Sequence, residues 1–209
     1  MKIAIISGAP QPWLDLEEIR SSFVIGVDYG ALTAVNQGLH LNLAIGDFDS
    51  VTDLEFEVIK QGSSEIIKLS PQKNETDTEV ALNVVLAKQA TEVVIYGALG
   101  GRIDHSLANI RLLLQFIKKG ISITLVDQKN ILTILSPGQH EIKQPRLPYI
   151  SFFALESTVE NLTLTGLKYP LKNYTLTQED IRCISNEIID SSFNVSFSSG
   201  YLLMIYSCD

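Results

Sequence analysis

The sequence predicts an α/β protein, with an N-terminal doubly wound parallel-sheet (Rossmann-like) domain followed by a C-terminal antiparallel β-sandwich domain. Through residue 127, short apolar runs alternate with longer amphipathic segments, the pattern of strands joined by crossover helices. Beyond residue 127 the apolar runs are short, rich in Thr, Ser and aromatic residues, and separated by Pro, Gly and Asn. We therefore place two domains at residues 1–127 and 128–209.

Six runs rich in Ile and Val are the expected strands of the first domain. Turn or charged residues bound each run, as is usual for buried parallel strands. The runs cover residues 2–7, 23–28, 42–47, 65–70, 92–98 and 121–127.

Two of the segments between these strands carry clear helix signals. Residues 76–89 open with Thr76 and Glu79 in capping-box spacing and repeat apolar residues every four positions. Residues 104–120 carry an apolar stripe and end in two lysines and a glycine. The members of the stripe are Leu107, Ile110, Leu114 and Ile117.

The second domain reads as antiparallel β structure. Four short stretches are rich in Thr, Ser and aromatic residues, and only residues 177–185 could hold a helical turn. The stretches are residues 130–142, 149–156, 161–171 and 194–207.

Composition and charge exclude several classes of protein. The net charge is −8, and residues 1–127 hold 10 basic against 16 acidic side chains, so we expect no nucleic-acid partner. No apolar run is long enough to span a membrane, and the N-terminus does not resemble a signal peptide. Cys183 and Cys208 are too few for a disulfide framework, so we expect a cytoplasmic protein with reduced thiols.

Charged side chains gather at the predicted strand ends, where ligands bind in an open parallel sheet. Asp28 ends the second strand, Asp47 and Asp49 follow the third, and Asp77 opens the helix after the fourth. Taken singly, Asp28 fits a turn, Asp77 fits the start of a helix, and the Asp47–Asp49 pair fits a solvated Asx turn. Four carboxylates at one edge would repel each other, and they are the hard ligands that suit Mg²⁺ bridging to phosphates.

A glycine-rich stretch, "GALGGRIDHS" at residues 97–106, follows the fifth strand. It offers backbone N–H groups, a helix N-terminus and the Arg102 guanidinium to phosphate oxygens, although it matches no standard nucleotide motif. His105 and Asn109 share a helix face and could hold Asp104 and Arg102 in place. His105 could equally be an ordinary packing residue at the start of a helix.

Five short motifs resemble, in order and spacing, those of the thiamine pyrophosphokinase family. They are "DYGA" at 28–31, "GDFDS" at 46–50, "TDTEVAL" at 76–82, "GALGGRIDHSLANI" at 97–110 and "ISNEI" at 184–188. The resemblance spans most of the chain. It implies a nucleotide-binding catalytic domain, a thiamine-binding and dimerisation domain, and a homodimer with active sites between subunits. The implied reaction is Mg²⁺-dependent transfer of pyrophosphate from ATP to the hydroxyl of thiamine, releasing AMP.

The resemblance also implies roles for the residues at matching positions of this chain. The implied metal ligands are Asp47, Asp49 and Asp77, which together with Arg102 and Asp104 form the catalytic set. The implied ATP-binding residues are Asp28, Gly30, Ser50, Thr76, Gly100, Gly101, Arg102 and His105. The implied thiamine-binding residues are Asp104, Asn109, Ser185 and Asn186. A general base, either Asp104 or Asp77, has a minor role because a loose transition state needs little base assistance.

Two departures from the family pattern concern aromatic residues. Tyr29 stands where the family usually has a second glycine, and the single tryptophan, Trp13, lies far from the late position that some relatives use near the thiamine ring. Another aromatic residue must contact that ring. Tyr169, Tyr201 and Phe197 are the candidates, and each also fits an ordinary β-domain core.

Two other functions account for part of the pattern. A strand-end D-x-D pair also holds the metal of nucleotide-sugar glycosyltransferases, but that function leaves "GGRIDH" without a role. A non-catalytic sensor that binds MgATP would use the same carboxylates without turnover. Release of AMP from ATP separates the pyrophosphokinase from both alternatives.

Overall fold

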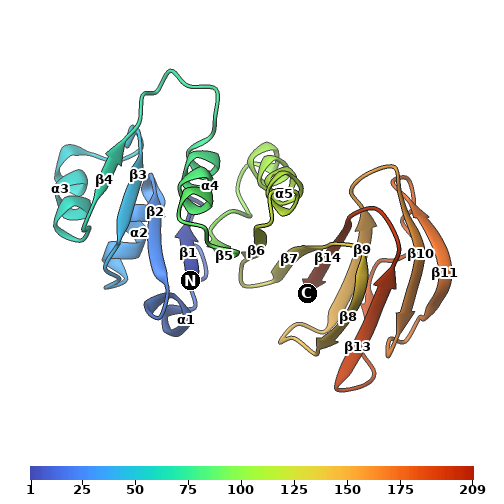
Figure 1. Cartoon of the computed structure of the whole chain (residues 1–209). Coiled ribbons are helices and arrows are strands. Elements are labelled where there is room, and N and C mark those ends of the chain that lie inside the picture. The colour runs from blue at the N-terminus through green and yellow to red at the C-terminus, as the bar shows by residue number, and fades with distance from the viewer. The chain divides into compact units, whose positions relative to one another are not determined.

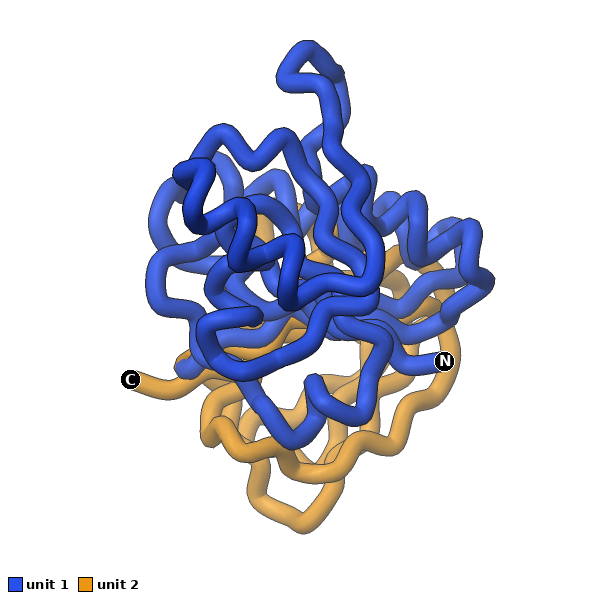
Figure 2. Tube along the Cα trace, turned by 90° about the vertical axis from the view of Figure 1, so that its left-hand side faces the viewer, with its two compact units in different colours: residues 1–128 blue, residues 129–209 orange.

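The computed structural model describes residues 1–209, and the chain divides into two compact units. Unit 1 comprises Met1–Gln128 and unit 2 comprises Lys129–Asp209, coloured blue and orange in Figure 2. The predicted α/β class is confirmed, with a parallel sheet in unit 1 and antiparallel sheets in unit 2.

Unit 1 is built on six parallel strands, visible in Figure 1. They are β1 (Lys2–Ile6), β2 (Phe23–Val27), β3 (Leu43–Gly46), β4 (Ile66–Lys68), β5 (Glu92–Tyr96) and β6 (Ser122–Val126). Their spatial order is β6-β5-β1-β2-β3-β4, and every pairing is parallel. The chain therefore builds the sheet outward from β1 to β4 and then returns to add β5 and β6 on the other side. The direction reverses between β1 and β5, the position at which open α/β sheets bind ligands.

Five helices connect these strands. They are α1 (Leu16–Arg20), α2 (Tyr29–Asn36), α3 (Asp53–Gln61), α4 (Asp77–Ala87) and α5 (Ile103–Ile117). Thr76 caps α4 by accepting a hydrogen bond from the N–H of Glu79, as the sequence predicts. A capping box with both reciprocal bonds forms instead at α3, between Thr52 and Glu55.

Helix α5 packs on β6 with a different face from the stripe that its sequence suggests. Leu112, Leu113 and Phe116 are its buried residues, whereas Leu107 is 50% exposed. The remainder of the predicted stripe, Ile110, Leu114 and Ile117, is only partly buried. The fourfold apolar spacing correctly indicated a helix, but it did not identify the side that covers the sheet.

Unit 2 contains eight strands in two antiparallel groups. The first has the order β12 (Asn186–Glu187), β9 (Tyr149–Ala154), β14 (Leu202–Ser207), β7 (Asn130–Leu135). The second has the order β11 (Leu171–Thr177), β10 (Thr158–Thr165), β13 (Ser192–Phe197), β8 (Gly138–Lys143). Both groups contribute to one hydrophobic core that includes Phe152, Phe193 and Met204. Thr177 ends β11, and residues 178–185 form turns and irregular backbone without a helix.

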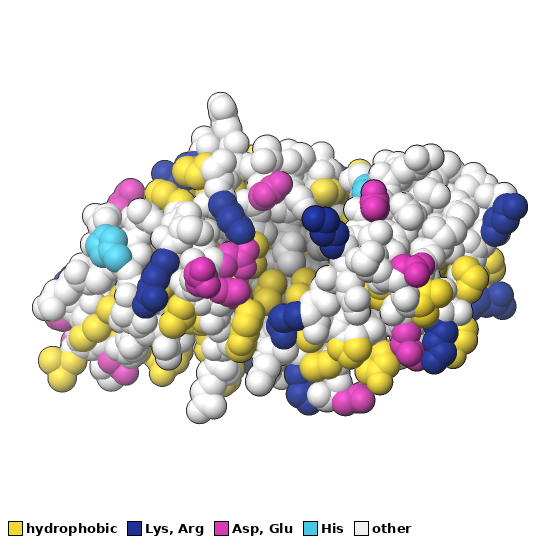
Figure 3. All heavy atoms as spheres, turned by 90° about the horizontal axis from the view of Figure 1, so that it is seen from below, with side chains coloured by type: hydrophobic (Ala, Val, Ile, Leu, Met, Phe, Trp, Pro, Cys, Tyr) yellow, Lys and Arg dark blue, Asp and Glu magenta, His cyan; other side chains and the backbone are white.

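The composition also bears on the cysteines, the surface charge and the helices. Both cysteines are free, and burial raises the pKa of the Cys183 thiol to about 11, which keeps it protonated. On the face drawn in Figure 3, the Lys and Arg side chains stand apart among acidic ones and form no basic stripe. None of the helices combines the length and apolar character needed to cross a bilayer.

Candidate active site

A cavity of about 570 Å³ opens in unit 1 at the carboxyl ends of β1, β2 and β5. This is where the strand order reverses, so the cavity lies at the position that the topology favours. Ten residues predicted from the sequence line it: Asp28, Asp49, Ser50, Thr76, Asp77, Gly100, Gly101, Arg102, His105 and Asn109. The predicted residues outside the lining are Gly30, Asp47, Asp104, Ser185 and Asn186.

The carboxyl end of β1 also lines the cavity, and the sequence analysis missed it. Ser7 and Gly8 lie there, and the buried Ser7 hydroxyl is 3.4 Å from the hydroxyl of Thr78 in the first turn of α4. The signal was available, because Ser7 follows the apolar run of β1 just as Asp28 follows that of β2. This strand end carries no charged residue, and for that reason it was not singled out.

The loop after β3 packs against the side chain of Asp28. Asp28 has a φ of 46°, an uncommon conformation for a residue with a side chain, and its Oδ1 accepts a hydrogen bond of 3.2 Å from the N–H of Phe48. A Cβ placed on Gly46 would lie 1.9 Å from the same oxygen, so a larger residue there would displace the Asp28 carboxylate. Asp28 therefore shapes the loop that carries Asp47 and Asp49.

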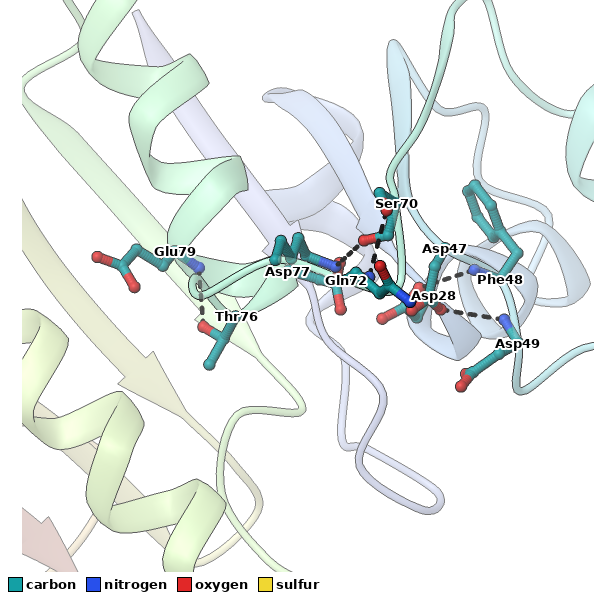
Figure 4. Close-up of polar contacts among 10 residues, drawn as sticks. Asp28, Asp47, Phe48, Asp49, Ser70, Gln72, Thr76, Asp77 and Glu79 are labelled. Carbon is teal, nitrogen blue, oxygen red and sulfur yellow. Dashed lines mark hydrogen bonds and ion pairs between the residues drawn. The ribbon is translucent and has the colours of Figure 1, made fainter.

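Asp28, Asp47, Asp49 and Asp77 form an acidic cluster, drawn in Figure 4. The Asp28, Asp47 and Asp77 carboxylates lie close together there, and that of Asp49 stands apart. Asp47 Oδ1 accepts a hydrogen bond of 3.1 Å from the N–H of Asp49, so the Asx turn weighed from the sequence does form. It uses one oxygen of Asp47 and leaves the Asp49 carboxylate uncommitted.

The cluster supplies carboxylate oxygens that can bind a divalent cation, although these oxygens do not form a complete metal site. Asp77 Oδ1 is buried without a hydrogen-bond donor of good geometry, and its charge is met by the Lys73 ammonium 2.7 Å away. No three His, Cys, Asp or Glu side chains of the chain are grouped in a geometry that could hold a metal. The four carboxylates of the cluster outnumber the nearby cationic side chains, and their hard oxygens suit Mg²⁺. This ion binds one or two carboxylates and completes its coordination shell with water and phosphate oxygens.

Burial and neighbouring charge act strongly on Asp28. Burial raises the pKa of its carboxyl group from 3.8 to about 7, with further contributions from the hydrogen bond to Asp77 and the negative charge of Asp77. The Phe48 N–H opposes this shift. The folded protein therefore holds a proton on this carboxyl between pH 3.8 and 7 that the unfolded chain has released.

Asp28→Asn is expected to stabilise the protein in the absence of divalent cations at pH 8. The raised pKa means that the free energy of unfolding falls as the pH rises through 7, and an amide removes that loss. Because Asp28 is partly exposed, solvent screening limits the gain to roughly 1–2 kcal/mol. Urea denaturation with EDTA at about pH 8 and about pH 4 checks this: the advantage of the variant should shrink at the lower value, and an equal advantage at both would contradict it.

Arg102 and Asp104 pair with each other at the start of α5. The Arg102 guanidinium donates from Nε and Nη2 to the two carboxylate oxygens, at 3.1 and 2.5 Å, and the pair is largely exposed. The hydrogen bond from Arg102 lowers the pKa of the Asp104 carboxyl, which is therefore ionised at neutral pH. Arg102 lines the cavity and Asp104 does not, so Asp104 aligns the guanidinium in this state.

Asn109 has a different partner from the predicted one. Its Nδ2 donates to the carbonyl oxygen of Ala98 at 2.8 Å, so it fixes the glycine-rich loop to α5 and does not hold Asp104 or Arg102. The reason lies in the left-handed backbone at Gly97, Gly100 and Gly101, which curls the loop over the first turns of the helix. His105, a predicted ATP-binding residue, lines the cavity.

Gly30 and Tyr29 open α2 beside the cavity. A Cβ on Gly30 would lie 2.2 Å from the carbonyl oxygen of Ile6, so this glycine lets α2 pack closely on β1 and does not itself line the cavity. Tyr29, at the position where a second glycine was expected, lines the cavity and is 41% exposed.

The C-terminal motif lies in unit 2, where Asn186 has a structural role. Its side chain accepts from the N–H of Tyr169 at 2.9 Å and donates to the carbonyl oxygen of Tyr169 at 2.8 Å. Both ends of this buried amide are therefore occupied by backbone. Ser185 is exposed beside it with a φ of 53°. Of the three aromatic candidates, Phe197 is buried in the core and Tyr169 is 59% exposed.

Comparison with protein families matches both units. Residues 16–125 match the model described as "Thiamin pyrophosphokinase, catalytic domain", which covers more than half of the chain. Residues 139–202 match "Thiamin pyrophosphokinase, vitamin B1 binding domain". The chain belongs to the thiamin pyrophosphokinase family.

Individual relatives support this assignment over the whole chain. The thiamine pyrophosphokinase of Bacillus subtilis (strain 168) is 39% identical over 211 residues, which cover 99% of each chain. The crystal structure of thiamine pyrophosphokinase from Bacillus subtilis superposes with a TM-score of 0.93 at 38% identity, covering 100% of both chains. That of thiamin pyrophosphokinase from Geobacillus thermodenitrificans gives 0.88 at 36% identity, covering 100% of this chain and 98% of the other.

The thiamin pyrophosphokinase from Candida albicans is similar in fold at 17% identity, with a TM-score of 0.86. The predicted family and enzyme class are confirmed by the family models and the closely similar relatives. The glycosyltransferase alternative has no support among them.

Proposed function

We propose that the protein transfers pyrophosphate from ATP to the hydroxyl of thiamine in a Mg²⁺-dependent reaction that yields thiamine diphosphate and AMP. The observation that carries this proposal is the cavity in unit 1, which combines carboxylates, a glycine-rich loop and an arginine at the switch point of the sheet. These are the elements needed to hold a polyphosphate with its metal. The family match supports the choice of thiamine as acceptor.

In the proposed complex, the polyphosphate lies over the glycine-rich loop. A Cβ on Gly100 would meet no atom within 4 Å, and one on Gly101 would meet only Pro10 at 3.7 Å, so phosphate oxygens can approach the backbone N–H groups. The dipole of α5 adds positive potential at its N-terminus, and the Arg102 guanidinium turns from Asp104 to the phosphates. Thr76, Ser50 and His105 complete the ATP-binding surface.

Asp49 and Asp77, with Asp47 beside them, are the proposed metal ligands. When bound there, Mg²⁺ would neutralise phosphate charge and hold the triphosphate in one conformation. In the reaction, the thiamine oxygen forms a bond to the β-phosphorus as the bond from that phosphorus to the AMP oxygen breaks, and the hydroxyl proton passes to water. The protein contributes mainly alignment and charge stabilisation, so no strong general base is required.

The residues proposed to contact thiamine are Asp104 in unit 1 and, in unit 2, Ser185 and the exposed Tyr169. Because Asn186 is bonded to the backbone of Tyr169, it positions that residue and does not contact thiamine directly. We also propose a cytoplasmic homodimer with active sites between subunits. Ile103 and Leu107 on α5 are 84% and 50% exposed, and pairing with a second copy would remove this apolar surface from water.

The deciding experiment incubates the purified protein with ATP, MgCl₂ and thiamine and quantifies AMP and thiamine diphosphate. Equimolar products that require both thiamine and Mg²⁺ are expected. ATP binding without turnover would instead favour the sensor, and ADP as product would contradict pyrophosphate transfer. Sedimentation of the same sample should give a dimer, and a monomer at micromolar concentration would contradict the homodimer.

A further inference from the structure

Lys73 brings a positive charge into the acidic cluster. It lies between β4 and α4, in a segment that rises away from the sheet in Figure 1 and contains no helix or strand. Its Nζ is 2.7 Å from Asp77 Oδ1 and 3.4 Å from the carbonyl oxygen of Ser70. The Lys73 side chain is only 17% exposed, unusually low for a lysine.

The position of this ammonium conflicts with a metal at the same oxygen. Mg²⁺ binds carboxylate oxygens at about 2.1 Å and keeps several waters of its own. A metal ion on Asp77 Oδ1 would therefore place a double positive charge within about 5 Å of Nζ, where the repulsion is strong in a partly buried site. The two cations compete for one buried oxygen.

Polyphosphate would remove this conflict. A nucleotide that arrives with the metal carries phosphate oxygens, which offer the displaced ammonium new acceptors beside the cluster. The ends of the segment that bears Lys73 are fixed by β4 and α4, and its middle has no ladder hydrogen bonds to break. A shift of the ammonium by a few ångströms therefore requires no change in the sheet.

We propose that Lys73 is the resident counter-cation of the acidic cluster and makes metal binding conditional on nucleotide. The divalent cation replaces the ammonium at Asp77 Oδ1, and the ammonium transfers to the phosphate oxygens. This inference rests on the proposed metal role of Asp77. It predicts positive coupling between metal and nucleotide, because each ligand lowers the free-energy cost of binding the other.

The test measures Mn²⁺ binding to the full chain without nucleotide, by electron paramagnetic resonance of the free ion. K73M is expected to bind Mn²⁺ about five- to tenfold more tightly than the wild type, the lower range of typical coupling between sites. At saturating Mn²⁺, the same variant should bind a non-hydrolysable ATP analogue about fivefold more weakly. These opposite signs separate the proposal from a purely structural role, which would weaken both.

Two control variants define the origin of the effect. K73R keeps the cation and should behave as the wild type, while K88M removes one positive charge at the far end of α4 and should leave Mn²⁺ binding unchanged. A thermal melt verifies folding, and K73Q replaces K73M should the latter not fold.

Unchanged or weaker Mn²⁺ binding by a folded Lys73 variant overturns the proposal. Failure of both wild type and variant to bind Mn²⁺ overturns it together with the metal role of the cluster. The titration contains no thiamine and involves no turnover, so its result is independent of the product assay that tests the proposed reaction.

Discussion

Asp49→Asn is expected to lower kcat by about 10²–10³-fold, the range observed when a single electrostatic contact to the reacting groups is removed. Asp49 lines the cavity, and its carboxylate stands apart from the other three in Figure 4, uncommitted to the fold. The substitution keeps the backbone N–H that bonds to Asp47 Oδ1, so the loop should retain its conformation. What is lost is one negative charge for the metal.

Measurement of kcat over a range of Mg²⁺ concentrations checks this prediction. The variant should require more Mg²⁺ for half-maximal rate, because a neutral amide oxygen is a weaker ligand than a carboxylate. Asp53→Asn is the matched control, since Asp53 is exposed in the first turn of α3, four residues away and outside the cavity. Full activity of Asp49→Asn at limiting Mg²⁺ would rule out Asp49 as a metal ligand.

Gly97→Ala is expected to lower the free energy of unfolding by about 2–5 kcal/mol. Gly97 has a φ of +68°, and a Cβ there would lie 2.4 Å from the carbonyl oxygen of Ser7. The left-handed conformation costs an L-residue about 1–2 kcal/mol, and overpacking typically adds about 1–3 kcal/mol. Such a loss is a large part of the total stability of an ordinary domain, roughly 5–15 kcal/mol.

Gly97 also joins two walls of the cavity, so this substitution should affect binding. Its carbonyl oxygen accepts a hydrogen bond from the N–H of Ala9 at 3.1 Å, which ties the end of β5 to the segment after β1. Gly100→Ala is the matched control: Gly100 has a φ of +90° but open space where a methyl group would lie, so only the conformational cost of about 1–2 kcal/mol applies. Urea denaturation compares the two, and equal losses would contradict the steric argument.

Several elements of the fold follow from local sequence alone. The apolar runs at residues 2–7 and 23–28 became β1 and β2, because buried parallel strands need continuous apolar residues on both faces. The Thr76 cap and the start of α4 were equally readable, since capping depends on residues three positions apart. The rule that ligands bind at strand ends then predicted that Asp28, Asp49 and Asp77 lie in one site, and all three line the cavity.

Other features depend on which side chains meet in space. The Thr52–Glu55 capping box was not singled out, and the buried face of α5 could not be distinguished from its exposed stripe by periodicity. Asn186 is bonded to the backbone of Tyr169, seventeen positions away, and no local pattern specifies such a partner. Lys73 looked like an ordinary loop lysine until the structure placed its ammonium on Asp77.

By itself, the sequence determined the α/β class, the order of the parallel strands along the chain, the family motifs and half of the residues that line the cavity. These depend on short-range periodicity and on the rule that parallel strands end at one edge. The tertiary structure decided how the charges are shared: Asp28 is protonated more readily because it is buried beside Asp77, and Lys73 occupies the oxygen that a metal would use. Desolvation and Coulomb interactions vary with distances between segments far apart in the chain, and only folding sets those distances.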